Sequence, residues 1–282
     1  MQSFDLVRAS DRAAAIAAGA ASTTAQQGAS VRYLAGGTTL VDLMKLGVER
    51  PERVIDINRL GLADISRQAN GDLSVGATAR NSDLAHHPLV RERYAALSQA
   101  VLAGASTQLR NAATTAGNLL QRTRCMYFRD PASACNKRDP GSGCAAIAGA
   151  NRMLAILGTS EACIASHPSD MAVAMLAYDA VVHVEGVSGQ RQIPLTDFYV
   201  LPGNRPDIET VLKPGDLVTH VTLPAPPQGE RSAYLKLRDR ASYEFALVSA
   251  AVGLDISDGV IRRGIRCSYD DSQACIAGTP CA

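Results

Sequence analysis

The feature that most constrains this fold is a stretch of 46 residues, 121–166, that shows neither helical nor strand periodicity. This stretch, called the cysteine segment below, holds four of the seven cysteines, namely Cys125, Cys135, Cys144 and Cys163. Loops of this length without regular structure are uncommon in compact domains, and those that occur are usually functional. The rest of the chain must therefore fold around a long insertion with a function of its own.

The spacing of these cysteines, C-x9-C-x8-C-x18-C, indicates which metal they could bind. Structural zinc sites usually contain close C-x2-C pairs, so zinc is disfavoured. Four thiolates on an irregular loop suit an iron–sulfur cluster. Between Gln121 and Cys144 there are five basic and two acidic residues, a surplus that would offset the negative charge of thiolates and cluster. Free or partly buried thiols in a long loop are the alternative.

The other three cysteines, Cys267, Cys275 and Cys281, crowd the last 16 residues. The odd total argues against a secreted disulfide framework. The N-terminus, MQSFDLVRAS, has an acid at Asp5 and no apolar core of a signal peptide. We therefore expect a cytoplasmic protein by default.

Composition excludes several classes of protein. The chain has 282 residues, of which 46% are hydrophobic, enough for a core in one large or two ordinary domains. A formal net charge of +1 gives no reason to expect nucleic acid or an anionic membrane as a partner. No run of 18 apolar residues is present, so we expect no membrane insertion.

Periodicity divides the chain into three parts, for which we predict the boundaries 1–58, 59–224 and 225–282. The first contains a strand at 31–35, a glycine turn, a helix at 40–46 and a strand at 53–57. The second contains a hairpin around Asn70-Gly71-Asp72, single helices at 89–101 and 169–178, and the cysteine segment. The third follows the proline-rich linker at 224–227. After Arg262 no helical or strand period is visible.

Two short loops could bind a phosphate-bearing ligand. The turn Ala35-Gly36-Gly37-Thr38-Thr39 joins a strand to a helix, where free backbone amides suit phosphate, although an ordinary tight turn is equally consistent with it. The run 114–118 again offers small side chains and hydroxyls. Together they suggest an extended cofactor. The G-x-G-x-x-A match at 141–146 is rejected as a dinucleotide motif because no strand precedes it.

These segments together resemble the FAD-binding subunits of the xanthine dehydrogenase family, the molybdenum hydroxylases. LAGGTTLVDLMK (34–45) is similar to that family's first flavin loop, and STQLRNAATTAGNL (106–119) is similar to its second. HPSDMAVAMLAYDAVV (167–182) and SAYLKLRDRASYEFALVSAAVGL (232–254) resemble the next two blocks. The insertion RTRCMYFRDPASACNKRDPGSGCAAI resembles the periplasmic aldehyde oxidoreductase type, whose flavin subunit carries an additional [4Fe–4S] cluster.

The resemblance implies the site residues. Two groups would bind FAD, the first loop and the second: Leu34, Ala35, Gly36, Gly37, Thr38, Thr39 and Leu40, then Thr114, Thr115, Gly117 and Asn118. Asp170 aligns with a flavin-contacting acid, and Lys236 with a lysine near the isoalloxazine ring, although the run around Lys236 could also be a solvated strand edge. Cys125, Cys135, Cys144 and Cys163 match the [4Fe–4S] ligands, and no catalytic residue is assigned.

The resemblance also implies the fold class, which is α+β. It consists of a two-subdomain FAD-binding fold of the vanillyl-alcohol oxidase (PCMH) type, followed by a smaller α+β C-terminal domain. That domain is expected to be truncated or altered after about residue 262, where the chain departs from the family pattern. In that case Cys267, Cys275 and Cys281 are not ligands.

The implied function is electron transfer in a complex. A large molybdenum-cofactor subunit would oxidise an aldehyde or heterocycle, a small [2Fe–2S] subunit would relay electrons, and the FAD of this subunit would deliver them to an acceptor. Such a subunit could also reach the periplasm by co-export with a signal-bearing partner. The alternatives are a freestanding FAD-dependent oxidase of the same fold and an inactive truncated remnant.

Overall fold

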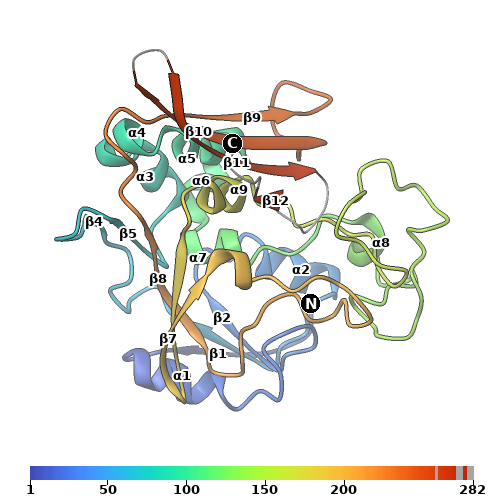
Figure 1. Cartoon of the computed structure of the whole chain (residues 1–282). Coiled ribbons are helices and arrows are strands. Elements are labelled where there is room, and N and C mark those ends of the chain that lie inside the picture. Colours follow the sequence, from blue (N-terminus) through green and yellow to red (C-terminus); the bar gives the residue numbers. More distant parts are fainter. Residues whose placement is uncertain (258–259, 271–275, 278–282) are drawn as a thin grey trace.

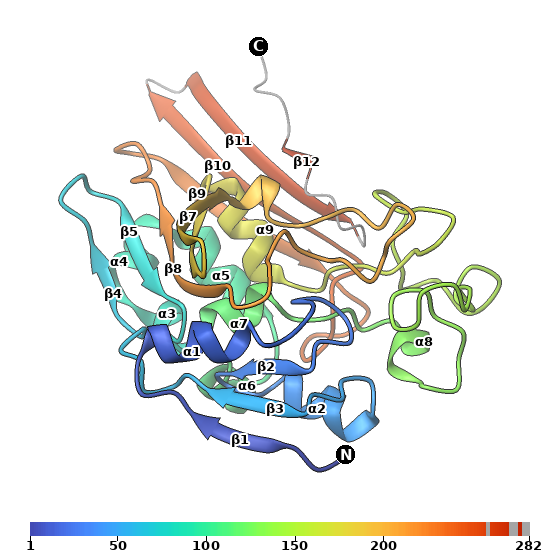
Figure 2. The same cartoon turned by 90° about the horizontal axis from the view of Figure 1, so that it is seen from below.

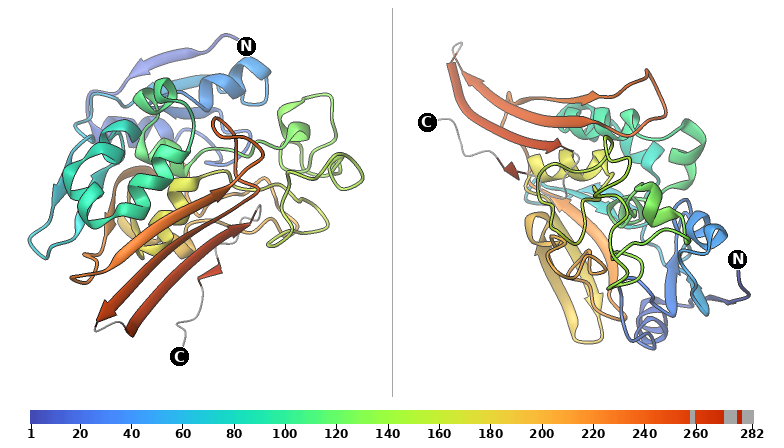
Figure 3. Two further views of the ribbon diagram at one scale, coloured as in Figure 1. Left: turned by 90° about the horizontal axis from the view of Figure 1, so that it is seen from above. Right: turned by 90° about the vertical axis from the view of Figure 1, so that its right-hand side faces the viewer.

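Three β-sheets with helices between them organise the computed structural model, which describes residues 1–257, 260–270 and 276–277. The first and third sheets lie at opposite ends of the molecule, and most of the helices lie between them (Figures 1 and 3). Among these described residues, no helix is long and apolar enough to cross a membrane. The mixture of helices and sheets confirms the predicted α+β class.

The first sheet is parallel and follows from the predicted strand–turn–helix–strand unit. Strands β1 (Asp5–Arg8), β3 (Arg53–Asp56) and β2 (Val31–Leu34) pair in that order, with helices α1 (Arg12–Gly19) and α2 (Leu40–Leu46) in the connections. Asp11 caps α1 by accepting a 2.8 Å hydrogen bond from the Ala14 amide. Gly47, at φ +73°, ends α2 in the left-handed conformation. The glycine turn therefore lies between the end of β2 and the start of α2.

The second sheet is antiparallel and has the strand order β4-β5-β8-β6-β7. Its strands are β4 (Ile65–Arg67), β5 (Leu73–Gly76), β6 (Val181–Gly186), β7 (Gly189–Pro194) and β8 (Leu217–Leu223). Inward-facing Leu73, Val75, Val182, Val221 and Leu223 are fully buried and form much of the main core. The hairpin turn predicted at Asn70-Gly71 is confirmed, because Gly71 lies at φ +94° between β4 and β5.

Short helices fill the space between the second and third sheets. They are α3 (Asn81–His86), α4 (Pro88–Arg93), α5 (Ala95–Ala103), α6 (Thr107–Ala112), α7 (Thr115–Leu119) and α9 (Asp170–Ala177), with a 3₁₀ turn at Leu195–Asp197. The single helix predicted at 89–101 is wrong, since Tyr94 leaves the helical conformation and divides α4 from α5. The Tyr94 hydroxyl donates to the carbonyls of Leu223 and Pro224. A tertiary contact therefore sets this break.

The third sheet is antiparallel and consists of β9 (Arg231–Leu237), β10 (Val248–Ser257), β11 (Val260–Asp270) and β12 (Ile276–Ala277). Helices α5 and α9 pack against β9 and β10. The expectation that no strand follows Arg262 is wrong, because β11 pairs with β10 as far as Asp270. Cys267 lies in β11, but its side chain, Cys275 and Cys281 lie outside the described residues. The boundaries near 58 and 224 stay predictions.

The cysteine segment lies to one side of the molecule, beside α2 (Figure 2). Its only described helix is the single turn α8 (Met126–Arg129), which agrees with the irregular structure predicted. It has a small apolar core separate from the main one, to which α2 and the following loop contribute Leu43 and Val48. Fully buried Phe128 and three of the four cysteines belong to the same core. The segment therefore shares packing with the helix that follows the glycine turn.

Candidate functional site

Two neighbouring cavities meet at the glycine turn. The first lies between the first sheet and the start of β8, and the second lies between α5, α9, β9 and the cysteine segment. Five residues line both cavities: Thr38, Thr39, Gly117, Gln121 and Arg122. The second cavity has a volume of about 640 Å³, within the range of roughly 300–1,000 Å³ usual for ligand sites. The two cavities, which share these wall residues and are called the joined cavities below, together offer room for a long ligand.

The first loop is pressed against the end of α6, directly before the second loop. A Cβ placed on Gly36 would lie 2.1 Å from the carbonyl oxygen of Ala112, so only glycine fits there. Gly37 has φ +72°, which also favours glycine. The loop leaves the Thr39 side chain without a capping hydrogen bond at the start of α2. This close approach of backbones, with hydroxyls and amides at the edge, suits a dinucleotide cofactor, whose diphosphate needs such contacts.

Side-chain hydrogen bonds hold the second loop in place. The Thr114 hydroxyl caps α7 by accepting from the Gly117 amide at 3.3 Å. The Asn118 side-chain oxygen accepts from the Ser169 hydroxyl at 2.6 Å and from the Gln121 amide at 2.9 Å. Asn118 is therefore fixed at the wall of the second cavity.

A buried ion pair lies at the wall of the second cavity. The Lys236 ammonium lies 2.8 Å from Asp170 Oδ2, and the Tyr234 hydroxyl donates to Asp170 Oδ1 at 2.5 Å. The side chains of Lys236 and Asp170 are only 4% and 9% exposed. The alternative of a solvated strand edge at Lys236 is thus wrong, because Lys236 points toward α9 while its neighbours on β9 face outward.

The predicted FAD residues divide between the two cavities. The first is lined by Ala35, Gly36, Gly37, Thr38, Thr39, Leu40, Thr114 and Gly117. The second is lined by Thr38, Thr39, Gly117, Asn118, Asp170 and Lys236. Leu34 and Thr115 line neither, and fully buried Thr115 donates to the Ala79 carbonyl instead.

Sequence reasoning missed a largely buried network of five charged side chains beside the cavities, none of them more than 18% exposed. Arg122 Nη1 lies 2.5 Å from Glu49 Oε1, and its Nε pairs with Glu209. Arg32 pairs with Glu49 at 2.9 Å, and Lys137 pairs with Glu209 at 3.0 Å. The members come from distant parts of the chain, so no local pattern marks them. The surplus of basic residues in the cysteine segment was the only signal.

His167 lies against this network. Its Nε2 is 3.1 Å from the Leu119 carbonyl oxygen, and its ring packs on Tyr199 with centroids 4.5 Å apart. Burial lowers the pKa of His167 to about 4. The negative charge of Glu209 opposes this shift, whereas the positive charge of Lys137 adds to it.

We expect His167 to make the fold sensitive to acid. The unfolded chain binds this proton near pH 6.5, whereas the folded chain binds it only near pH 4, so acidification between these values favours unfolding. The free energy of unfolding should fall by about 3 kcal/mol more in the wild type than in His167→Gln between pH 7 and pH 4. Urea unfolding of both proteins across this range measures the difference, and parallel pH profiles would contradict it.

The four cysteines of the cysteine segment gather in its small core. Cys125, Cys135 and Cys163 are buried, and Cys144 packs against them. The backbones of Cys135 and Cys144 form an isolated antiparallel β-bridge, and all four thiols are free. Burial raises the pKa of the Cys125 thiol and raises that of Cys163 to about 11. Among the described residues, no group of three or more cysteine, histidine or acidic side chains is arranged to hold a single metal ion.

Comparison with known proteins agrees with this geometry. Residues 2–226 match the family described as the FAD binding domain in molybdopterin dehydrogenase. The chain is 59% identical to the aldehyde oxidoreductase FAD-binding subunit PaoB of Escherichia coli over 232 residues. This alignment covers 82% of this chain and 73% of PaoB. It is 26% identical to the nicotinate dehydrogenase FAD-subunit of Eubacterium barkeri over 80% of this chain and 61% of that subunit.

Solved structures show the same fold. The CO dehydrogenase from Oligotropha carboxidovorans superposes with a TM-score of 0.69 at 23% identity, over 95% of this chain and 74% of that chain. Quinoline 2-oxidoreductase from Pseudomonas putida 86 gives a TM-score of 0.66 at 21% identity, over 95% and 74%. The resemblance inferred from the two loops is therefore confirmed: this chain belongs to the FAD-binding subunits of the molybdenum hydroxylase family of oxidoreductases.

Proposed function

We propose that this chain is the electron-transfer flavoprotein of a molybdenum-dependent aldehyde oxidoreductase complex. The observation that carries the proposal is the pair of joined cavities, in which the two glycine-containing loops meet the buried Asp170–Lys236 pair. The identity of 59% to an aldehyde oxidoreductase FAD-binding subunit supports an aldehyde as the substrate of the complex. The partners would be a large molybdenum-cofactor subunit and a small [2Fe–2S] subunit.

The residues of this chain would bind and orient the cofactor. Bound FAD supplies the redox chemistry, accepting electrons and passing them to an acceptor. The loop at 35–39 and the start of α7 would hold the diphosphate at the junction of the cavities, since both offer small residues and hydroxyls there. Lys236, held by Asp170, would place a fixed positive charge in the second cavity, where it would stabilise added negative charge.

The cysteine segment would hold a [4Fe–4S] cluster through Cys125, Cys135, Cys144 and Cys163. Two features support this assignment. The four thiols lie in or against one small apolar core, as such a cluster requires. Buried Lys137 and Arg138 lie in the same segment, where they would offset the charge of cluster and thiolates.

The test is an absorption spectrum of anaerobically purified protein, with flavin and iron measured on the same sample. We expect one FAD and about four irons per chain. Flavin without iron would overturn the cluster assignment alone, and absence of flavin would overturn the proposed function. Co-purification with two partner subunits would separate a complex from a freestanding oxidase.

A further inference from the structure

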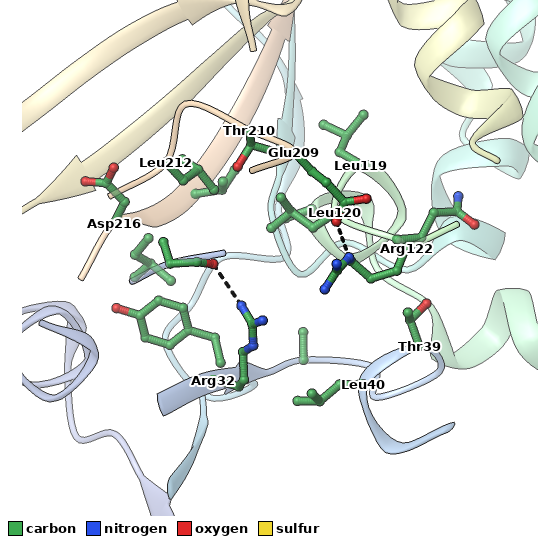
Figure 4. A pocket seen from close by; sticks show the side chains of 18 of the residues that line it. Arg32, Thr39, Leu40, Leu119, Leu120, Arg122, Glu209, Thr210, Leu212 and Asp216 are labelled. Carbon is green, nitrogen blue, oxygen red and sulfur yellow. Dashed lines mark hydrogen bonds and ion pairs between the residues drawn. The ribbon is translucent and has the colours of Figure 1, made fainter. Parts of the chain in front are cut away.

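Arg122 lies where the two cavities meet, yet the predicted site residues do not include it. It lines both cavities together with Thr38, Thr39 and Gly117. Its side chain is only 12% exposed, and Figure 4 shows its guanidinium between Glu209 and the first-loop residues Thr39 and Leu40. A ligand that extends from one cavity into the other would therefore pass the Arg122 side chain.

The hydrogen-bonding pattern of Arg122 is incomplete. Nη1 donates to Glu49 and to the Gln27 side chain, at 2.5 and 2.9 Å, and Nε forms the ion pair with Glu209. Nη2 is buried and, like Nε, has no hydrogen-bond acceptor within the part of the chain that the structure describes, and the guanidinium lies 4.9 Å from the centre of the Phe128 ring. A buried donor of a charged group without an acceptor is costly, by about 1–3 kcal/mol. This donor therefore suits a ligand oxygen.

An anion is the natural acceptor for this donor. Glu49 and Glu209 already hold the guanidinium through Nη1 and Nε, and they also pair with Arg32 and Lys137. A phosphate oxygen at the junction would supply the missing acceptor, and arginine is well suited to it.

We infer that Arg122 binds the diphosphate of the dinucleotide through its guanidinium group, opposite the hydroxyls of the first loop. Glu49 and Glu209, which also line the first cavity, act as positioning residues because they hold the guanidinium. This inference rests on the proposed function, because it assumes that FAD occupies the joined cavities. It adds a binding residue contributed by the cysteine segment to those of the two loops.

The test compares ligands with and without the diphosphate. Dissociation constants for FAD, ADP, adenosine and riboflavin are measured by titration calorimetry on the full chain after its flavin has been removed. In Arg122→Gln, FAD and ADP should bind about 10- to 100-fold more weakly, while riboflavin and adenosine should bind as in the wild type. Arg93→Gln is the matched control, because Arg93 is a half-buried arginine on α4 that lines neither cavity.

The variant Arg122→Lys controls for misfolding, because it keeps a positive charge between Glu49 and Glu209. Lysine lacks the planar guanidinium group that can bind two phosphate oxygens at once. The variant should remain folded by circular dichroism and bind ADP more weakly than the wild type. Unchanged ADP affinity in a folded variant would overturn the inference, as would an equal loss for riboflavin and ADP, which indicates a structural role only. If the wild-type chain binds no FAD, the proposed function itself fails.

Discussion

Replacing Gly36 with alanine is expected to weaken FAD binding at least tenfold and to lower the free energy of unfolding by about 2 kcal/mol. The new Cβ would lie 2.1 Å from the Ala112 carbonyl oxygen and 3.1 Å from the Cα of Ala113. The carbonyl cannot turn away easily, because it also accepts a hydrogen bond from Arg80. The two loops must therefore separate, and they form the junction between the cavities.

Fluorescence of released flavin and urea unfolding measure the two effects. Gly264→Ala is the matched control, since the same methyl group there lies 3.5 Å from its nearest neighbour, Leu254, an ordinary contact. Its flavin content should equal that of the wild type. Tight FAD binding by Gly36→Ala would show that the contact between the loops does not shape the site.

The second large effect is expected in Cys135→Ser, which should lose more than half of its iron. A serine hydroxyl stays protonated at neutral pH and cannot replace the thiolate that an iron–sulfur cluster needs. Cys135 is 6% exposed and lies across a strand bridge from Cys144, so no solvent ligand can readily take its place. Iron analysis and the cluster absorption of the purified protein measure the loss.

Cys275→Ser provides the comparison, because Cys275 is not among the predicted ligands. It should keep the iron content of the wild type. Equal iron content in both variants would contradict the four-cysteine assignment, whatever the flavin content.

The local elements were predictable where the signal lay in neighbouring residues. The helix Leu40–Leu46 has the predicted bounds because its apolar residues repeat at helical spacing and Gly47 ends it. The cap of α9 was also predictable from local sequence, because a serine precedes the helix. The Ser169 hydroxyl accepts a hydrogen bond from the Ala172 backbone amide at 3.0 Å. By contrast, β1 has four residues, all exposed, and therefore no periodicity to detect.

The parts that could not be predicted depend on contacts between distant residues. Tyr94 breaks a helix because its hydroxyl bonds to carbonyls at the end of β8. The residues around Lys236 alone left a solvated strand edge open as an alternative, because its partner Asp170 lies 66 residues away. Arg122 and Glu209 are farther apart still. The loops proposed to bind FAD carry their own signal, whereas the charges around them become neighbours only when the chain has folded.

The packing of α2 has a consequence for how the protein matures in the cell. The helix begins where the flavin loop ends, yet Leu43, and Val48 just after it, are buried in the core of the cysteine segment and not in the main core. If that segment orders around iron, the support of the flavin loop is completed only after metal has been inserted. Iron supply would then limit flavin occupancy, and a cell short of iron would accumulate a chain deficient in both cofactors.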